Sequence, residues 1–265
     1  MIETDRRRAL RAGVGLLAAG ALTTGCAATG PAPAPDRPPA SRSPGPPGEA
    51  PRPALAAAPA PRSFPGHPAQ LDHGPRTRPR VALTFHGQGD PAIAKALLTE
   101  AEKAGAKVTV LAVGTWLDAH PDLARRILDG GHDLGNHTHH HLDINAMSEA
   151  EATAEITGCA DRLRRLTGSI GTWFRPSRTR TATPLVERLA RRAGYPHVLS
   201  YDVDSLDFTS PGAPAVTRKI AAEIRPGSVV SLHFGYADTV AALPAVLTEL
   251  ERRGLRAVTT TELLT

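Results

Sequence analysis

The sequence predicts an α/β domain built on a parallel sheet, and three observations lead to this prediction. From Val81 onward, short apolar runs rich in β-forming residues alternate with amphipathic stretches of helical period. Prolines stand where several of these helices should begin, and glycines where they should end. Such alternation is typical of a parallel sheet covered by helices on both faces. Seven strands in about 185 residues can close into a distorted (β/α)7 barrel or remain an open doubly wound sheet.

The individual elements follow from apolar period and capping signals. The predicted strands are residues 81–85, 108–113, 132–135, 172–174, 198–203, 228–232 and 256–259. The predicted helices are residues 91–104, 121–129, 148–166, 184–193, 214–224 and 239–252. Ser148 with Glu151 forms a capping box at the start of the longest helix. The sequence contains no Gly-rich phosphate-binding fingerprint that would support the open sheet.

The first 26 residues have the features of an export signal. A basic region at Arg6–Arg11 precedes an apolar run at Val14–Leu22, which is too short to span a bilayer stably. Small residues then lead to Cys26, as in a bacterial lipobox, and the arginines resemble a twin-arginine signal. We expect lipidation of Cys26, the alternative being an ordinary cleavage site. The protein is therefore expected outside the cytoplasm, at the outer face of the cytoplasmic membrane or in the cell wall, with secretion as the alternative.

Residues 27–79 are expected to form a tether, and residues 80–265 the working domain. Sixteen of the 25 prolines fall between residues 27 and 80, a composition that favours extended chain over a packed core. Residues 1–80 carry a net charge of +6, whereas residues 81–265 carry −1. The basic pI of about 9.7 therefore belongs to the leader and tether. No nucleic-acid partner is expected for the domain.

A histidine-rich stretch is the most unusual feature of the domain. Four of the eleven histidines fall between residues 137 and 141. On a helical turn, His137 and His141 would lie on one face, where two imidazoles can bind one divalent cation. His139 would lie off that face. A solvated histidine-rich loop is the simpler alternative.

Seven polar residues follow the ends of predicted strands. They are His86, His137, His141, Arg175, Asp204, Asp207 and His233. The carboxyl ends of parallel strands meet at one rim, where α/β proteins place their sites. Each residue has a structural explanation when it is taken alone, such as an ion pair or a turn. Their common position predicts a functional site.

Six motifs then appear in a fixed order. They are Leu83–Phe85, Gly131–His141, Leu166–Gly168, Phe174–Pro176, Asp204–Phe208 and Pro226–His233. Together they resemble the polysaccharide deacetylases of the NodB-homology type, carbohydrate esterase family 4, over residues 80–265. The resemblance implies a distorted (β/α) barrel and a divalent metal, usually zinc. It also implies hydrolysis of N-acetyl groups from a glycan, which would be the substrate.

The resemblance assigns roles to most of the rim. His137 and His141 match metal ligands, His233 matches the general acid, and Asp207 matches the carboxylate that orients it. A metal would polarise the acetamide carbonyl, while an acid protonates the leaving amine. The implied apolar substrate contacts are Phe208 and Leu232.

The first motif departs from the family pattern Thr-Phe-Asp-Asp-Gly. His86 stands at the position of the catalytic base, and Gly87 at that of the third metal ligand. Asp90 lies three residues further on and can supply a carboxylate to the site, as base or as ligand. Arg175 matches the residue that positions the base, and Arg178 adds a positive charge that the family pattern lacks.

Three functions are consistent with this pattern. The first is a metal-dependent deacetylase in which His86 is the base, or in which His86 and Asp90 share the base and third-ligand roles. The second is a glycan-binding module without catalysis, and the third is an amidohydrolase for another C–N substrate. The retained metal pair and acid pair favour a hydrolase acting on carbon–nitrogen bonds.

Overall fold

The computed structural model describes Gly30 and residues 58–265. By its internal contacts the chain divides into Met1–Arg52 and Pro53–Thr265, and the description below concerns the second unit. The expected export signal 1–26, the lipidation site Cys26 and most of the expected tether lie outside the described residues, so these expectations remain predictions. Within the described part of the chain, every helix is too short or too polar to cross a membrane.

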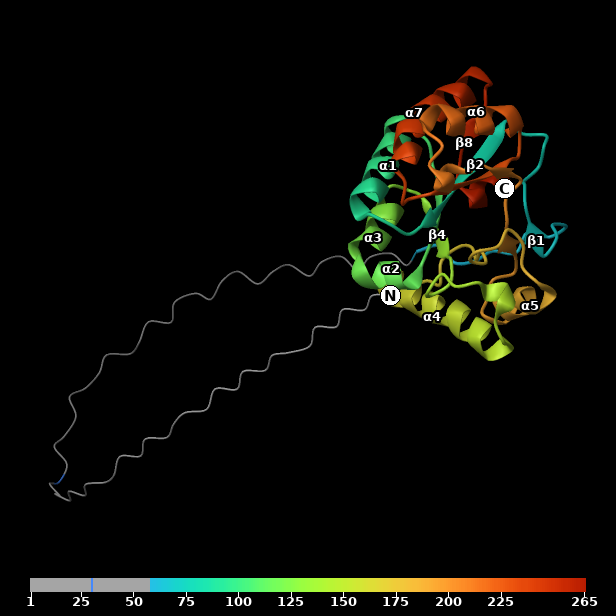
Figure 1. The fold of residues 1–265 in the computed structure, drawn as a ribbon. Helices are drawn as coiled ribbons and strands as arrows, with labels where there is room; N and C mark the ends of the chain where they lie inside the picture. Colours follow the sequence, from blue (N-terminus) through green and yellow to red (C-terminus); the bar gives the residue numbers. More distant parts are fainter. Residues whose placement is uncertain (1–29, 31–57) are drawn as a thin grey trace, which may run out of the picture. The chain divides into compact units, whose positions relative to one another are not determined.

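The centre of the domain is a parallel sheet in the order β4-β3-β2-β7-β6 (Figure 1). Its strands are β2 (Arg80–Gly87), β3 (Thr109–Ala112), β4 (Asp133–Asn136), β6 (Val203–Asp204) and β7 (Val229–His233), with β8 (Arg256–Ala257) beside the start of β2. A second parallel pair joins β1 (Gln70–Leu71) to β5 (Val198–Leu199). Bridges from Phe174 to Asn136 and to Val198 link β4 to β5. The strands thus continue around an irregular ring, which confirms the expected distorted barrel.

Helices cover the outside of this ring (Figure 1), except the last one, whose Leu263 packs in the interior with Ala82 and Val229. They are α1 (Pro91–Lys103), α2 (Gly114–Ala119), α3 (Asp122–Asp129), α4 (Glu149–Thr167), α5 (Pro184–Arg192), α6 (Ala213–Glu223), α7 (Ala237–Arg252) and α8 (Thr260–Leu264). Short 3₁₀ turns occur at Ile144–Ala146 and Asp207–Thr209. The predicted capping box of Ser148 and Glu151 opens α4 with both of its hydrogen bonds. The six predicted helices are all confirmed, because strong capping and apolar signals mark them.

Some elements differ from the prediction. Residues 172–174 make only isolated bridges through Phe174, and the segment 198–203 contains two short strands instead of one. The chain approaches β4 very closely at Gly171, where a Cβ would lie 2.7 Å from the Leu134 carbonyl oxygen. The short helices α2 and α8 and strand β1 were not predicted, because two to six residues carry too little periodic signal.

The domain begins earlier than the expected boundary at residue 80. Phe64 is buried and stacks on Trp173 with ring centroids 5.5 Å apart. The amide of Ala58 donates to the carbonyl of Thr167 at 2.9 Å. Residues 58–79 therefore belong to the folded unit and not to the tether, as a correction to the predicted division. A few apolar residues anchor this segment, and the surrounding prolines obscure them in the sequence.

Strand alternation decides which side chains face the interior of the barrel. Along β2, the side chains of Val81, Leu83 and Phe85 pack with the outer helices. The intervening residues Ala82, Thr84 and His86 face inward, since successive strand residues point to opposite faces. Their partners on β7 are Val229, Ser231 and His233. The interior is thus apolar at the amino ends of the strands and lined by histidine at the carboxyl ends.

Candidate active site

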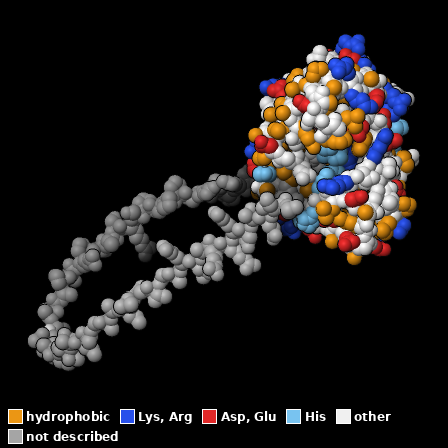
Figure 2. Space-filling model, viewed as in Figure 1, with side chains coloured by type: hydrophobic (Ala, Val, Ile, Leu, Met, Phe, Trp, Pro, Cys, Tyr) orange, Lys and Arg blue, Asp and Glu red, His pale blue; other side chains and the backbone are white. Residues whose placement is uncertain are grey.

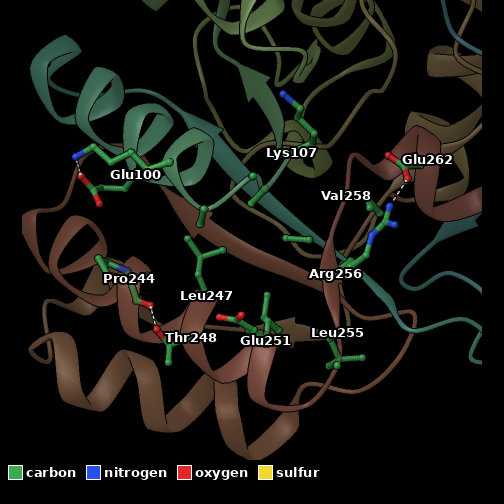
Figure 3. A pocket seen from close by; sticks show the side chains of 17 residues that line it. Glu100, Lys107, Pro244, Leu247, Thr248, Glu251, Leu255, Arg256, Val258 and Glu262 are labelled. Carbon is green, nitrogen blue, oxygen red and sulfur yellow. Dashed lines mark hydrogen bonds and ion pairs between the residues drawn. The ribbon is translucent and has the colours of Figure 1, made fainter.

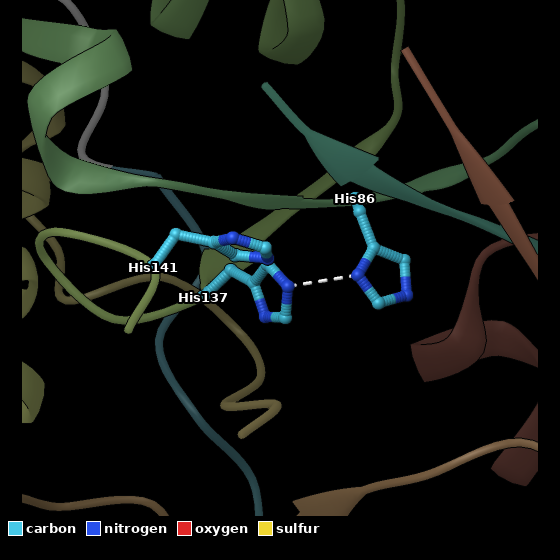
Figure 4. Close-up of side chains that lie close together, drawn as sticks. All are labelled: His86, His137 and His141. Atoms are coloured by element: carbon cyan, nitrogen blue, oxygen red, sulfur yellow. Dashed lines mark hydrogen bonds between the residues drawn. The ribbon is translucent and has the colours of Figure 1, made fainter. Parts of the chain in front are cut away.

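Three histidines converge at the carboxyl ends of the strands (Figure 4). His86 Nδ1 lies 2.8 Å from His137 Nε2, and the His137 and His141 rings have centroids 4.9 Å apart. One ring nitrogen from each of the three residues lies within 4.8 Å of the others. Such a group of imidazoles has the donor atoms of a site for a divalent metal such as zinc.

The hydrogen bonds of His137 fit a metal ligand. Its Nδ1 lies 3.0 Å from the carbonyl oxygen of Arg175, which accepts a hydrogen bond from the Nδ1–H group. The lone pair is therefore on Nε2, the nitrogen that faces His86. Metal-binding histidines usually donate their second N–H to a carbonyl or a carboxylate in this manner.

The second nitrogen of His86 has two polar neighbours. Its Nε2 lies 3.0 Å from Ser231 Oγ and 3.4 Å from Arg175 Nη1. For Nδ1 to bind a metal, the ring proton must be on Nε2, and the Ser231 hydroxyl oxygen can accept a hydrogen bond from that N–H group. With no metal bound, Nδ1–H can instead donate to His137 Nε2. His86 thus has partners for both neutral tautomers.

The neutral form of all three histidines is favoured. Burial lowers the pKa of His86 and His137 well below its usual range, and the neighbouring histidines lower it further. Burial and the Arg178 guanidinium lower the pKa of His141. Because a metal binds neutral imidazole, the cluster can accept a cation at neutral pH without first losing protons.

The loop between His137 and His141 is an irregular turn and not the expected helical turn. Thr138 has φ 67° and His141 has φ 59°, a conformation that is unfavourable for residues with a side chain. Glu155 of α4 holds this turn, because its Oε2 accepts hydrogen bonds from the amides of His139 and His140 at 3.0 and 2.8 Å. The turn still brings His137 and His141 together.

The acid half of the site is a buried carboxylate and a histidine. Asp207 Oδ1 lies 2.7 Å from His233 Nδ1, and its Oδ2 accepts from the His233 amide and from Thr239 Oγ1. Asp207 is completely buried, whereas His233 is partly exposed to the cleft. The carboxylate fixes the orientation of the ring, because it bonds to both Nδ1 and the amide of His233. The pair is thus arranged as a general acid with its orienting carboxylate.

Arg175 lies behind His86 and is completely buried. Its Nε and Nη2 donate to the carbonyls of Leu199 and Ser200 at 3.2 and 2.9 Å. Burial lowers the pKa of its guanidinium to about 10, which leaves it charged at neutral pH. Within the described part of the chain it forms no ion pair with a carboxylate. The positive charge instead faces the His86 ring.

The structure does not place Asp90 with the histidines. Its carboxylate accepts a hydrogen bond from the amide of Ala92 at 2.8 Å and caps α1, and the side chain is exposed. The ligand group consists of His86, His137 and His141. The expectation that Asp90 is a ligand or the base is therefore corrected. An N-cap aspartate before Pro91 satisfies the helix start, which explains its position.

Gly87, at the family's third-ligand position, also lies away from the site. It pairs with Ala112 in β3, and an added Cβ would lie 3.0 Å from the Ala112 Cα and 2.9 Å from Val110 Cγ1. A side chain here would point to the outer face of the sheet, opposite to His86, because the strand remains regular through Gly87. Only His86 of the first motif therefore reaches the histidine cluster.

The two expected substrate contacts differ in position. Phe208 is 44% exposed and lies beside His233, with ring centroids 5.5 Å apart. Leu232 is buried in the outer core between sheet and helices, because it alternates with the inward-facing Ser231 and His233. Leu232 is therefore corrected from a substrate contact to a core residue.

The candidate site lies in a cleft of about 790 Å³. Its walls include His86, His141, Phe208 and His233. Figure 2 shows histidine side chains in a hollow of the surface with Lys or Arg side chains beside them. The cleft is thus large enough for a sugar ring with its substituents, and the candidate metal and acid groups lie along its wall.

A second cavity of about 830 Å³ lies at the other end of the barrel, where α1, α7 and β8 meet (Figure 3). Its charged side chains include an ion pair between Arg256 and Glu262 at 3.2 Å. It contains no histidine and no metal-ligand group among the described residues. Although it is slightly larger, it lacks the chemistry of the first cleft.

Three residues of the site were not found by sequence reasoning. Ser231 bonds to His86, Glu155 holds the histidine turn, and Tyr201 lines the cleft beside Arg175. Ser231 alternates with His233 on a predicted strand, so its inward position could have been derived. No sequence signal marked Glu155, which lies on a helix far along the chain.

The model of the family described as polysaccharide deacetylase matches residues 73–198. A peptidoglycan-N-acetylglucosamine deacetylase of Bacillus cereus is 30% identical over 194 residues, which is 72% of this chain and 90% of that protein. The family model begins to match at residue 73, before the expected boundary at residue 80.

Solved structures share the fold. A crystal structure of a peptidoglycan N-acetylglucosamine deacetylase has TM-score 0.69 and 25% identity, covering 74% of this chain and 92% of that one. A family 4 pseudoenzyme from Bacillus anthracis has TM-score 0.71 and 23% identity, covering 75% and 70%. The latter shows the fold alone. This chain belongs to the polysaccharide deacetylase family, whose members are hydrolases acting on carbon–nitrogen bonds.

Proposed function

We propose that this protein is a metal-dependent deacetylase that removes N-acetyl groups from a cell-wall glycan. The observation that carries the proposal is the joint presence, in one cleft, of a three-histidine group and a buried acid pair. The names of the similar proteins support peptidoglycan as the substrate class. The fit of the histidines supports zinc.

His86, His137 and His141 would hold the metal, with His86 as the third ligand rather than the base. This assignment rests on His86 Nδ1, which faces His137 Nε2 at 2.8 Å. A divalent ion bound there would polarise the acetamide carbonyl and lower the pKa of a water molecule toward neutrality. That effect would reduce the need for a carboxylate base, which the first motif lacks.

The remaining residues would move protons and exclude water. His233 would donate a proton from Nε2 to the leaving amine, since Asp207 holds its Nδ1. Ser231 would hold the His86 ring by accepting a hydrogen bond from its Nε2–H. Phe208 would cover the sugar from the open side, where it is partly exposed.

A glycan-binding module without catalysis is the second candidate. The loss of both carboxylates from the first motif favours it, because neither His86 nor Gly87 supplies the anionic base of the family pattern. Both candidates share the cleft and the fold. They differ only in whether an acetyl group is released.

Acetate release from N-acetylated glycan strands decides between the two candidates. The full chain is incubated with zinc and purified glycan strands, and His233→Ala and Asp207→Asn are the matched variants. Acetate that appears with the wild-type protein and falls at least 100-fold with either variant would support the deacetylase. Saturable glycan binding without acetate, unchanged by either substitution, would establish the binding module instead.

A further inference from the structure

Two arginines line the open side of the cleft. Arg178 and Arg180 are both exposed, and both contribute to its wall. Arg178 Nε donates to the carbonyl of His141 at 3.1 Å, and Arg180 Nε donates to the carbonyl of Tyr201 at 3.0 Å. The guanidinium of Arg180 also lies 5.4 Å from the centroid of the Tyr201 ring. These contacts anchor each arginine by Nε and leave the terminal Nη atoms for a ligand.

Neither arginine has a carboxylate partner in the described part of the chain. The ion pairs of this part include Arg76 with Asp202 and Arg192 with Glu149, but none with Arg178 or Arg180. Asp204 is the one carboxylate in the described cleft wall, and its Oδ1 accepts from the amide of Leu206. Asp207 is buried and bonded to His233. The two guanidinium groups thus face the cleft with little negative charge nearby to balance their positive charge.

The site as a whole also carries more positive charge than a site with the residues of the family pattern would carry. That pattern has two adjacent carboxylates in the first motif, where this chain has His86 and Gly87. The buried guanidinium of Arg175 remains, and Arg178 is an addition. A bound divalent cation would add two further charges. An anionic group on the substrate would therefore be attracted to this cleft.

We propose that Arg178 and Arg180 form a subsite for a carboxylate carried by the glycan. The planar guanidinium binds carboxylate through paired N–H donors, and it needs no deprotonation to do so. Arg178 is bonded to the backbone of His141, so the carboxylate would bind next to the sugar whose acetamide reaches the histidines. The inference rests on the proposed function and specifies an acidic, N-acetylated glycan as its substrate class.

The test compares substrates that differ only in this charge. One is a tetrasaccharide of alternating N-acetylglucosamine and N-acetylmuramic acid with free lactyl carboxylates, and another is the same molecule with those carboxylates amidated. A neutral chitotetraose is the third. We expect kcat/KM with the acidic tetrasaccharide to exceed that with its amide about tenfold, mainly through KM, the usual scale of one charge-assisted hydrogen bond near a surface.

Arg180→Gln, alone and with Arg178→Gln, should remove this preference and leave the amidated substrate little affected. Arg188→Gln is the matched control, because Arg188 is also exposed but lies on α5 and outside the cleft wall. Higher salt should also reduce the preference, since it screens exposed charges. Equal turnover of acid and amide by the wild-type protein would overturn the proposal, as would an equal loss with both substrates in Arg180→Gln.

Calorimetric binding of the acidic and amidated tetrasaccharides separates this inference from the proposed function. If no substrate releases acetate, the deacetylase assignment fails, but tighter binding of the acid, abolished by Arg180→Gln, would still support the subsite. Equal affinity for acid and amide would reject the subsite whether or not the protein is an enzyme.

Discussion

The two halves of the candidate site have departed from the family pattern to different degrees. In the acid half, Asp207 and His233 form a buried, oriented pair at 2.7 Å with Thr239 as a further donor. In the base half, the two carboxylates of the pattern are replaced by His86 and Gly87, and Arg175 has no described carboxylate partner. One half is therefore retained, whereas the other has been rebuilt around a histidine.

This difference shows how one strand can change the chemistry of a site without changing the fold. β2 remains regular through Gly87, so of the two residues that replace the carboxylates only His86 points to the interior. Histidine at that position lies within reach of His137 and His141 and can join them. The rebuilt half thus offers three neutral ligands where the family pattern has two histidines and a carboxylate.

The largest effect is expected in the retained half. Asp207→Asn removes the charge that orients and supports His233, so acetate release should fall on the order of 10²–10⁴-fold. Metal content should not change, because Asp207 is not in the ligand group. Steady-state kinetics with elemental analysis checks both expectations. A variant that loses its metal would show that the two halves are not independent.

The rebuilt half should also depend on Glu155, which bonds to the turn between its ligands. Glu155→Ala removes the acceptor for two backbone amides and should weaken metal affinity roughly 10- to 100-fold, the usual effect of removing a ligand's support. Glu155→Gln keeps an acceptor oxygen and should lose less. Competition with a chelator of known affinity provides the measurement. Equal affinity in the alanine variant and the wild type would mean that the turn needs no such support.

Restoring the two carboxylates of the family pattern tests whether the base half can return to that pattern on this strand. In His86→Asp with Gly87→Asp, the new side chain at residue 87 would meet the Ala112 backbone, so we expect a loss of about 1–3 kcal/mol in unfolding free energy. The activity should not rise, since residue 87 points away from the cluster. His86→Asp alone is the control, and it should fold normally. Higher activity in the double variant than in the wild type would contradict this account of β2.

The smallest expected effect is a dependence of stability on pH. Burial lowers the pKa of His86 and His137, so the folded, metal-free domain keeps them neutral. The unfolded chain protonates them below roughly pH 6.5 and then binds more protons than the folded state. Stability should therefore be insensitive to these groups above that pH and fall below it, by up to about 1.4 kcal/mol per pH unit for each histidine.

Urea unfolding of the metal-free protein between pH 8 and pH 5 measures this slope. His86→Asn removes one of the two groups and should flatten the dependence, whereas His73→Asn, at an exposed position in the first residues of the domain, should not. If the free energy of unfolding falls with pH equally steeply in the wild type and in His86→Asn, burial of His86 does not make stability depend on pH.

Much of the fold and part of the site could be predicted from sequence. Helices α4 and α5 were located because a capping box or an N-terminal proline marks their start. His137 and His141 were paired by their spacing, although the turn that joins them is left-handed. Asp90 and Leu232 were misplaced although local signals mark them: Asp90 is an N-cap directly before Pro91, and Leu232 alternates with His233 along one strand. Glu155 reaches the site only through tertiary packing of α4, which no local pattern encodes.

The central claim is that a third histidine completes the metal site. The most direct test of this claim is the zinc affinity of His86→Ala. Calorimetry on metal-free protein should show one zinc ion per wild-type chain. His86→Ala should bind it at least 100-fold more weakly, because two ligands hold zinc poorly. Asp90→Asn should bind as the wild type does, since its carboxylate caps α1. Wild-type affinity in His86→Ala, or a loss in Asp90→Asn alone, would contradict the account.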